Sequence, residues 1–137
     1  MNNILPPEPL NLTAIQTVKS MAIVIKEWLS STGSVKNMDT LLGHTSCLRH
    51  RMDFRTDKGT LLNLSIQAGE DLYSSPSETS LEYGFYKQVE LGYPSWTFSR
   101  NFIEEYAEDV SEPLDTVYPY VPLEVLAEEL LKAVRTL

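Results

Sequence analysis

The chain has 137 residues, of which 42% are apolar and 22% charged, and its formal net charge is −8. This apolar fraction excludes a wholly disordered chain, and the acidic balance excludes duplex nucleic acid as the main ligand, because phosphates require a basic face. A single cysteine excludes an internal disulfide, and no apolar run approaches the ~20 residues that a membrane-spanning helix needs. Without a secretory signal pattern, we expect one cytoplasmic domain spanning residues 1–137.

Residues 1–10 contain three prolines and predict an extended N-terminal arm. A helix is predicted to begin at Asn11 or Thr13 and to continue to Leu29, because apolar residues recur every three or four positions. Gly33 is suited to the left-handed position that often follows a helix.

The same predicted helix has apolar residues around an unusually large part of its circumference. Ile23, Val24 and Trp28 lie outside the main apolar stripe. A helix of this kind is either deeply buried or covered by another subunit. We therefore expect a homodimer or higher homo-oligomer that forms through this helix or through the sheet.

A strand is predicted over 48–55, where apolar and charged residues alternate, followed by a turn at 57–59 and a return strand at 62–67. Residues 68–80 are polar and predict a mobile surface loop. A third strand is predicted over 81–91, with Gly84 marking a bulge or a close backbone approach.

Aromatic residues at 98, 102 and 106 indicate a short helix, and an edge strand is predicted at 115–118. Pro122 suits the first turn of a last helix that continues to Leu137. This order predicts an α+β fold, in which an antiparallel sheet of three to four strands is covered by an N-terminal helix, a C-terminal helix and one short helix.

Charge is divided unevenly along the chain. Residues 1–62 hold seven lysines and arginines against five acids, whereas residues 63–137 hold four against fourteen. Such asymmetry indicates a charged partner or an assembly in which the two halves face each other. The predicted partner-binding residues are the acids of the C-terminal half and nearby aromatic residues: Glu104, Glu105, Glu108, Asp109, Glu112, Asp115, Tyr93, Trp96, Tyr118 and Tyr120.

An alternative site uses arginine. Arg49, Arg51 and Arg55 have the same parity along the predicted strand 48–55 and would form a row on one of its faces. Guanidinium groups suit phosphate and carboxylate ligands, so the row could hold a nucleotide-like anion or pair with the acids of this same protein.

His44, Cys47 and His50 are spaced three residues apart, but steps of three alternate between the faces of a strand. We therefore expect no metal site and no cofactor. A hydrolase or transferase that uses Cys47 or a pair of carboxylates is the third hypothesis.

The favoured hypothesis is a non-enzymatic inhibitor or adaptor, of the type that viruses and mobile elements direct against host proteins. Its acidic half would bind a basic surface of another protein, for example one that itself binds nucleic acid, and no membrane is expected to take part.

Overall fold

The computed structural model describes residues 5–137, and its central element is a five-stranded sheet with the order β1-β4-β5-β6-β7. These strands span Leu10–Asn11 (β1), Met52–Arg55 (β4), Leu61–Gln67 (β5), Gln88–Gly92 (β6) and Val117–Pro122 (β7). β1 pairs parallel with β4, and the other neighbours are antiparallel. The α+β class is confirmed, but the sheet is larger than predicted because the proline-rich arm adds a two-residue strand.

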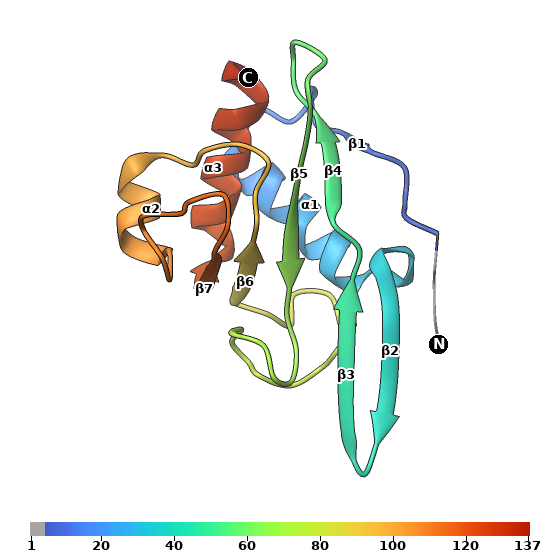
Figure 1. The fold of residues 1–137 in the computed structure, drawn as a ribbon. Helices are drawn as coiled ribbons and strands as arrows, with labels where there is room; N and C mark the ends of the chain where they lie inside the picture. The colour runs from blue at the N-terminus through green and yellow to red at the C-terminus, as the bar shows by residue number, and fades with distance from the viewer. Residues whose placement is uncertain (1–4) are drawn as a thin grey trace.

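Three helices accompany the sheet: α1 (Val18–Ser30), α2 (Arg100–Tyr106) and α3 (Leu123–Thr136). α1 and α3 lie together behind the sheet in Figure 1, and α2 lies beside β7. Because the helices cover one face of the sheet, buried and partly exposed residues alternate along its strands. In β5, Leu62, Leu64 and Ile66 are buried in the core, whereas Asn63 and Ser65 lie on the opposite face and are only partly buried.

A second, two-stranded sheet extends from this body as a hairpin of β2 (Val35–Leu41) and β3 (His44–Arg49). The hairpin projects from the lower end of the molecule in Figure 1. Its turn consists of Leu42 and Gly43, with φ of 54° and 76°, as a two-residue type I′ turn requires. The sequence prediction missed β2, because residues 35–41 are mostly exposed and show no strong apolar alternation.

The predicted strand 48–55 is wrong in one important respect. The chain leaves β3 after Arg49 and enters β4 at Met52, so the segment belongs to two different sheets. At the break, the amide of His50 donates a hydrogen bond of 2.8 Å to the carbonyl of Ser34 instead of continuing a strand ladder. Residues before and after the break therefore do not share one face.

Several predicted boundaries also move. α1 begins after Thr17, whose hydroxyl accepts the amide of Ser20, rather than after Asn11 or Thr13. Gly33 lies in a 3₁₀ turn, Thr32–Ser34, and not in a left-handed cap. The capping residue Thr17 was overlooked because apolar residues before it, such as Ile15, keep helical spacing.

Further along the chain, the return strand, its turn at Gly59 and the short helix α2 are confirmed. The third strand is shorter than predicted, since only Gln88–Gly92 is extended and Gly84 lies in a turn with φ of 76°. The edge strand is longer and ends at Pro122, which precedes α3 instead of lying inside its first turn. In the loop 68–80, Ala68 and Ser74 are buried, so part of this loop belongs to the interior.

Candidate functional site: an acidic surface around an apolar hollow

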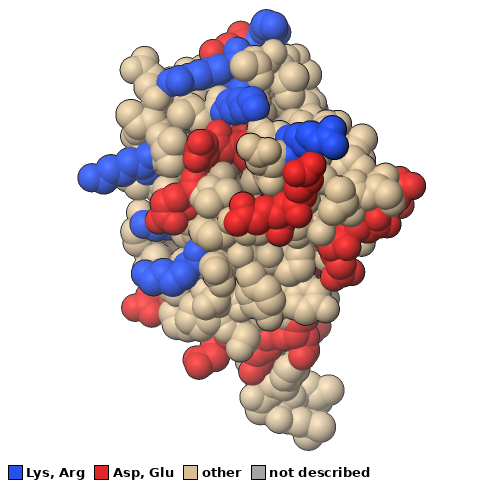
Figure 2. Space-filling model, turned by 90° about the vertical axis from the view of Figure 1, so that its left-hand side faces the viewer, with Lys and Arg blue, Asp and Glu red and all other residues tan. Residues whose placement is uncertain are grey.

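The six acids predicted to bind a partner are all exposed. Glu104 and Glu105 lie on α2, and the other four lie in the loop that joins α2 to β7. Figure 2 views the molecule from the α2 side and shows acidic groups across the middle and right of this face, with lysine and arginine groups over its upper part and left edge. Among residues 5–137 only Glu104 of this set forms an ion pair, with Arg100 at 2.9 Å. The other five carboxylates therefore leave a largely uncompensated negative charge.

One of these acids, Glu104, lines a hollow of about 370 Å³ between α2 and the following loop, together with its ion-pair partner Arg100. Phe98 and Ile103, both buried, contribute to its lining, together with Val110 and Pro113 from the loop. Val110 is half exposed, as is the nearby Leu114. The sequence prediction included the charges but missed this apolar hollow, because it depends on how the loop folds back over α2.

Two predicted aromatic residues do not belong to this surface. Trp96 is buried and its ring packs edge-on against Phe54, with centroids 5.4 Å apart. Tyr118 is also buried, and its hydroxyl donates a hydrogen bond of 2.6 Å to the carbonyl of Pro113. Burial raises the pKa of Tyr118 to about 12, so the ring supports the loop from below as a neutral phenol.

The other two aromatic residues are exposed but lie elsewhere. Tyr120 packs against Tyr73, with ring centroids 5.8 Å apart. Tyr93 lies at the end of the sheet beside Arg51, whose guanidinium binds its carbonyl. The six predicted acids therefore lie on one segment of the surface, α2 and the loop after it, but the four predicted aromatic residues are not part of that surface.

The predicted arginine row does not form. Arg49 is only 2% exposed, and its guanidinium donates hydrogen bonds to the carbonyls of Ala68 and Leu29. Arg51 and Arg55 are exposed on β4 or just before it, and Arg55 binds the carbonyl of Gly59. The reason is the break after β3, which directs Arg49 into the interior and the other two outward.

Cys47 and the two histidines do not converge. Cys47 is buried on the inner side of β3, and burial raises the pKa of its thiol, which disfavours the reactive thiolate. His44 is exposed at the start of β3, where Nε2 lies 2.5 Å from Asp71 and Nδ1 lies 3.4 Å from Glu70. Across residues 5–137, no group of three or more histidine, cysteine or acidic side chains is arranged to hold a metal ion.

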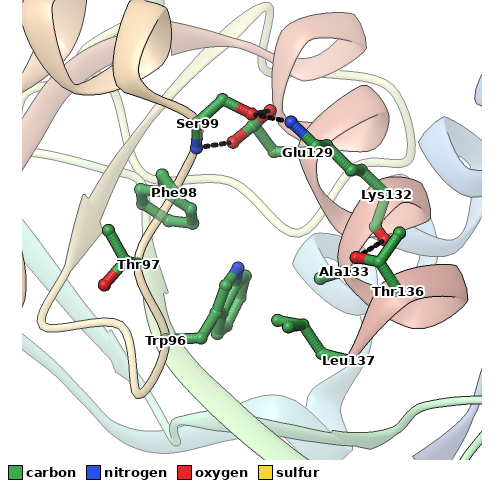
Figure 3. A pocket seen from close by; sticks show the side chains of 9 residues that line it. All are labelled: Trp96, Thr97, Phe98, Ser99, Glu129, Lys132, Ala133, Thr136 and Leu137. Atoms are coloured by element: carbon green, nitrogen blue, oxygen red, sulfur yellow. Dashed lines mark hydrogen bonds between the residues drawn. The ribbon is translucent and has the colours of Figure 1, made fainter.

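A cluster around Ser99, which the sequence prediction missed, lines a pocket of about 240 Å³ (Figure 3). Glu129 of α3 accepts hydrogen bonds from the amide of Ser99 at 2.7 Å and from its hydroxyl at 2.8 Å. Lys132 donates to the same hydroxyl at 2.7 Å. A detectable signal existed, because Glu129 is spaced three and four residues from Leu126 and Ala133 on the buried side of α3.

This cluster contains the serine–carboxylate hydrogen bond that an activated serine would also have. A serine nucleophile needs a base that removes its proton, and Glu129 could accept one. However, the exposed ammonium of Lys132 already occupies a lone pair of the Ser99 oxygen. The arrangement therefore ties the start of α2 to α3 through a satisfied network.

No known protein family, curated protein or solved structure matches this chain. Within the described part of the chain, no helix is both long and apolar enough to cross a bilayer.

Proposed function

We propose that this protein is a non-enzymatic interaction module whose acidic C-terminal half binds a basic surface of another protein. The observation behind the proposal is the combination of exposed, mostly unpaired acids with an adjacent apolar hollow lined by Ile103 and Val110. Acting as an inhibitor or adaptor, such a module would occupy a basic surface that its partner uses for another ligand.

The two parts of the surface have different roles in this proposal. The summed negative charge would attract and orient a basic partner, which mainly raises the association rate. The hollow would receive one apolar side chain of the partner, and burying such a side chain contributes roughly 1.5–3 kcal/mol. Affinity would therefore depend on salt through the acids and on shape through the hollow.

The proposal can be tested with a fluorescent lysine- and arginine-rich peptide that carries one central leucine. We expect it to bind the wild-type protein at low salt and to bind weakly at high salt, because exposed charges are screened. Replacing the leucine of the peptide with serine should weaken binding at any salt concentration.

Four acids are reversed in the decisive variant: Glu104, Glu105, Glu108 and Asp109, each to lysine. Reversal of each surface charge should cost little stability, about 0–1 kcal/mol, while binding is lost. The matched control reverses four exposed glutamates elsewhere: Glu8, Glu27, Glu82 and Glu128. Each set brings the formal net charge of −8 to zero. Equal loss of binding in both variants would mean that net charge alone acts, and would contradict a specific surface.

A further inference from the structure

A groove of about 460 Å³ opens at the junction between the β2–β3 hairpin and the main sheet. Its lining includes Lys36 of β2, together with Arg51, Asp53, Ser65 and Tyr93 from the main sheet and its margins. Asp53 and Ser65 belong to the face of the sheet opposite the core, since their neighbours Met52, Phe54, Leu64 and Ile66 are fully buried. The groove shares no lining residue with the hollow beside α2 or with the Ser99 pocket.

Two cations in this groove have no anionic partner. Neither Lys36 nor Arg51 forms an ion pair with a carboxylate of residues 5–137, although both are exposed. Asp53 is the one carboxylate among the lining residues. In a protein with a net charge of −8, a groove whose lining holds more positive than negative groups departs from the general pattern.

The guanidinium of Arg51 is held in position before any ligand arrives. Its Nε and Nη2 atoms lie 3.0 and 2.7 Å from Oδ1 of Asn63, and Nη2 also lies 2.5 Å from the carbonyl oxygen of Tyr93. These bonds use one edge of the guanidinium and none of them involves Nη1. A planar group fixed in this way can offer its remaining N–H donors to an oxyanion with little further loss of side-chain entropy.

Tyr93 itself has an unusual conformation. Its φ is 51°, in the left-handed region that few residues other than glycine adopt. Hydrogen bonds on both sides hold this conformation, since the amide of Tyr93 donates to Thr116 while its carbonyl accepts from Arg51. Nearly half of the tyrosine is exposed at the groove. Backbone strain of this kind is frequently found at binding sites.

The opposite wall of the groove is also fixed. The side-chain amide of Gln67 pairs with both main-chain groups of Arg49, accepting from its amide and donating to its carbonyl, each at 2.8 Å. Gln67 thus joins the base of the hairpin to β5 and keeps the position of Lys36 defined relative to the sheet.

From these contacts we propose that the groove binds a small ligand that carries both a phosphate group and an aromatic ring, as a nucleotide does. Lys36 and Arg51 would bind the phosphate, and the exposed ring of Tyr93 would stack on the base. This replaces the arginine row predicted from the sequence, because Arg51 is the only member of that row with an accessible guanidinium beside the groove. The ligand site is independent of the proposed binding of a basic protein.

The proposal is tested by titrating the full chain with ATP, and separately with inorganic phosphate, in a calorimeter. We expect ATP to bind more tightly than phosphate. Lys36→Gln and Arg51→Gln should each weaken ATP binding by roughly tenfold or more, and Tyr93→Ala should weaken the binding of ATP but not of phosphate. Arg55→Gln is the control, since Arg55 lies at the other end of β4 and binds only Gly59 among the contacts described for it.

Lys36→Gln keeps the test valid if Arg51→Gln disturbs the fold, because Lys36 is exposed and its side chain forms no ion pair with any of residues 5–137. Failure of ATP to bind at millimolar concentration would overturn the proposal. Equal effects of Lys36→Gln and Arg55→Gln would overturn the assignment to this groove, and equal affinities for ATP and phosphate would overturn the role of the aromatic ring.

Discussion

The guanidinium of Arg49 donates a hydrogen bond of 3.0 Å to the main-chain carbonyl of Leu29, in the last turn of α1. Carbonyls in the last turn of a helix lack intrahelical partners and carry a partial negative charge, so a buried cation is stabilised there. Arg49 also binds the carbonyl of Ala68 at 2.8 Å and lies over the ring of Tyr86, 5.9 Å from its centroid. The residue thus connects the projecting hairpin to both layers of the body.

Replacing Arg49 with leucine should lower the free energy of unfolding by about 2–4 kcal/mol, because the carbonyls of Leu29 and Ala68 would remain buried without a donor. Urea denaturation measures this change. Arg55→Leu removes an exposed arginine of the same predicted row and should alter the stability by no more than about 0.5 kcal/mol. If both variants were equally stable, Arg49 would not hold the hairpin to α1.

His44 should make docking of the hairpin dependent on pH. A hydrogen bond to Asp71, with the charges of Asp71 and Glu70, raises the pKa of His44 above its ordinary value of 6.5. A raised pKa in the folded state means that the stabilisation is complete below pH 6.5 and is lost as the pH rises through the folded-state pKa. The contact of His44 with Asp71 and Glu70, which holds the hairpin to the loop 68–80, should therefore weaken as the pH rises above the raised pKa of His44.

The pKa of His44 can be measured by NMR titration of its ring proton. Asp71→Asn should return the pKa towards 6.5, and asparagine also tolerates the positive φ of 66° at position 71. A His44 pKa of 6.5 or lower in the wild-type protein would show that His44 does not contact Asp71 and Glu70 in solution.

The Ser99 cluster should contribute to stability and not to catalysis. Ser99→Ala removes a hydrogen-bond donor to the buried carboxylate of Glu129, and should lower the free energy of unfolding by about 1–3 kcal/mol. Ser111→Ala, which removes an exposed contact with Asp109, serves as the control with little effect. Labelling of Ser99 by a serine-directed fluorophosphonate would contradict this role and would indicate a serine nucleophile, which the hydrolase hypothesis built on Cys47 or a pair of carboxylates did not include.

Self-association was predicted through the first helix or through the sheet, and the exposed apolar residues of the structure indicate a third place, the tip of the hairpin. Trp28 is buried, and Val24 contributes to a small pocket beside Pro7 and Leu10 of the N-terminal arm, while Ile23 is 40% exposed. Leu41 and Leu42, by contrast, are 71% and 96% exposed at the tip of the hairpin. If a dimer forms, we expect the hairpin to mediate it.

Light scattering should then give a mass above the 15.5 kDa of one chain. Leu42→Asp should return it to the monomer without unfolding, since aspartate accepts a positive φ better than leucine does. Val24→Asp should instead lower stability. A wild-type protein that is monomeric at micromolar concentration would exclude self-association of this kind.

The parts of the fold that sequence patterns predicted are those set by short-range periodicity. Residues 62–67 alternate cleanly because one face of β5 packs against the helices, and the spacing of Phe98, Phe102 and Tyr106 identifies α2. Arg49 could not be placed in this way. Its direction depends on the chain leaving one sheet and entering another, which alternation over 48–55 conceals.

In the candidate site, too, one part could be predicted from the sequence and the other could not. Exposure of the six acids follows from their charge, because an unpaired carboxylate is costly to bury. The apolar hollow beside them depends on long-range packing, in which Val110 and Pro113 fold back towards Ile103. Likewise, Lys36 and Arg51 line one groove although no local pattern relates β2 to the residue just before β4.

The most direct test of the proposed function is an NMR titration of the isotope-labelled protein with the lysine- and arginine-rich peptide that carries a central leucine. We predict the largest shifts at the methyl groups of Ile103 and Val110 and at the amides of the α2–β7 loop, with the methyl shifts absent for the serine-containing peptide. Shifts confined to the hairpin, or spread evenly over exposed acids such as Glu27 and Glu82, would contradict the account.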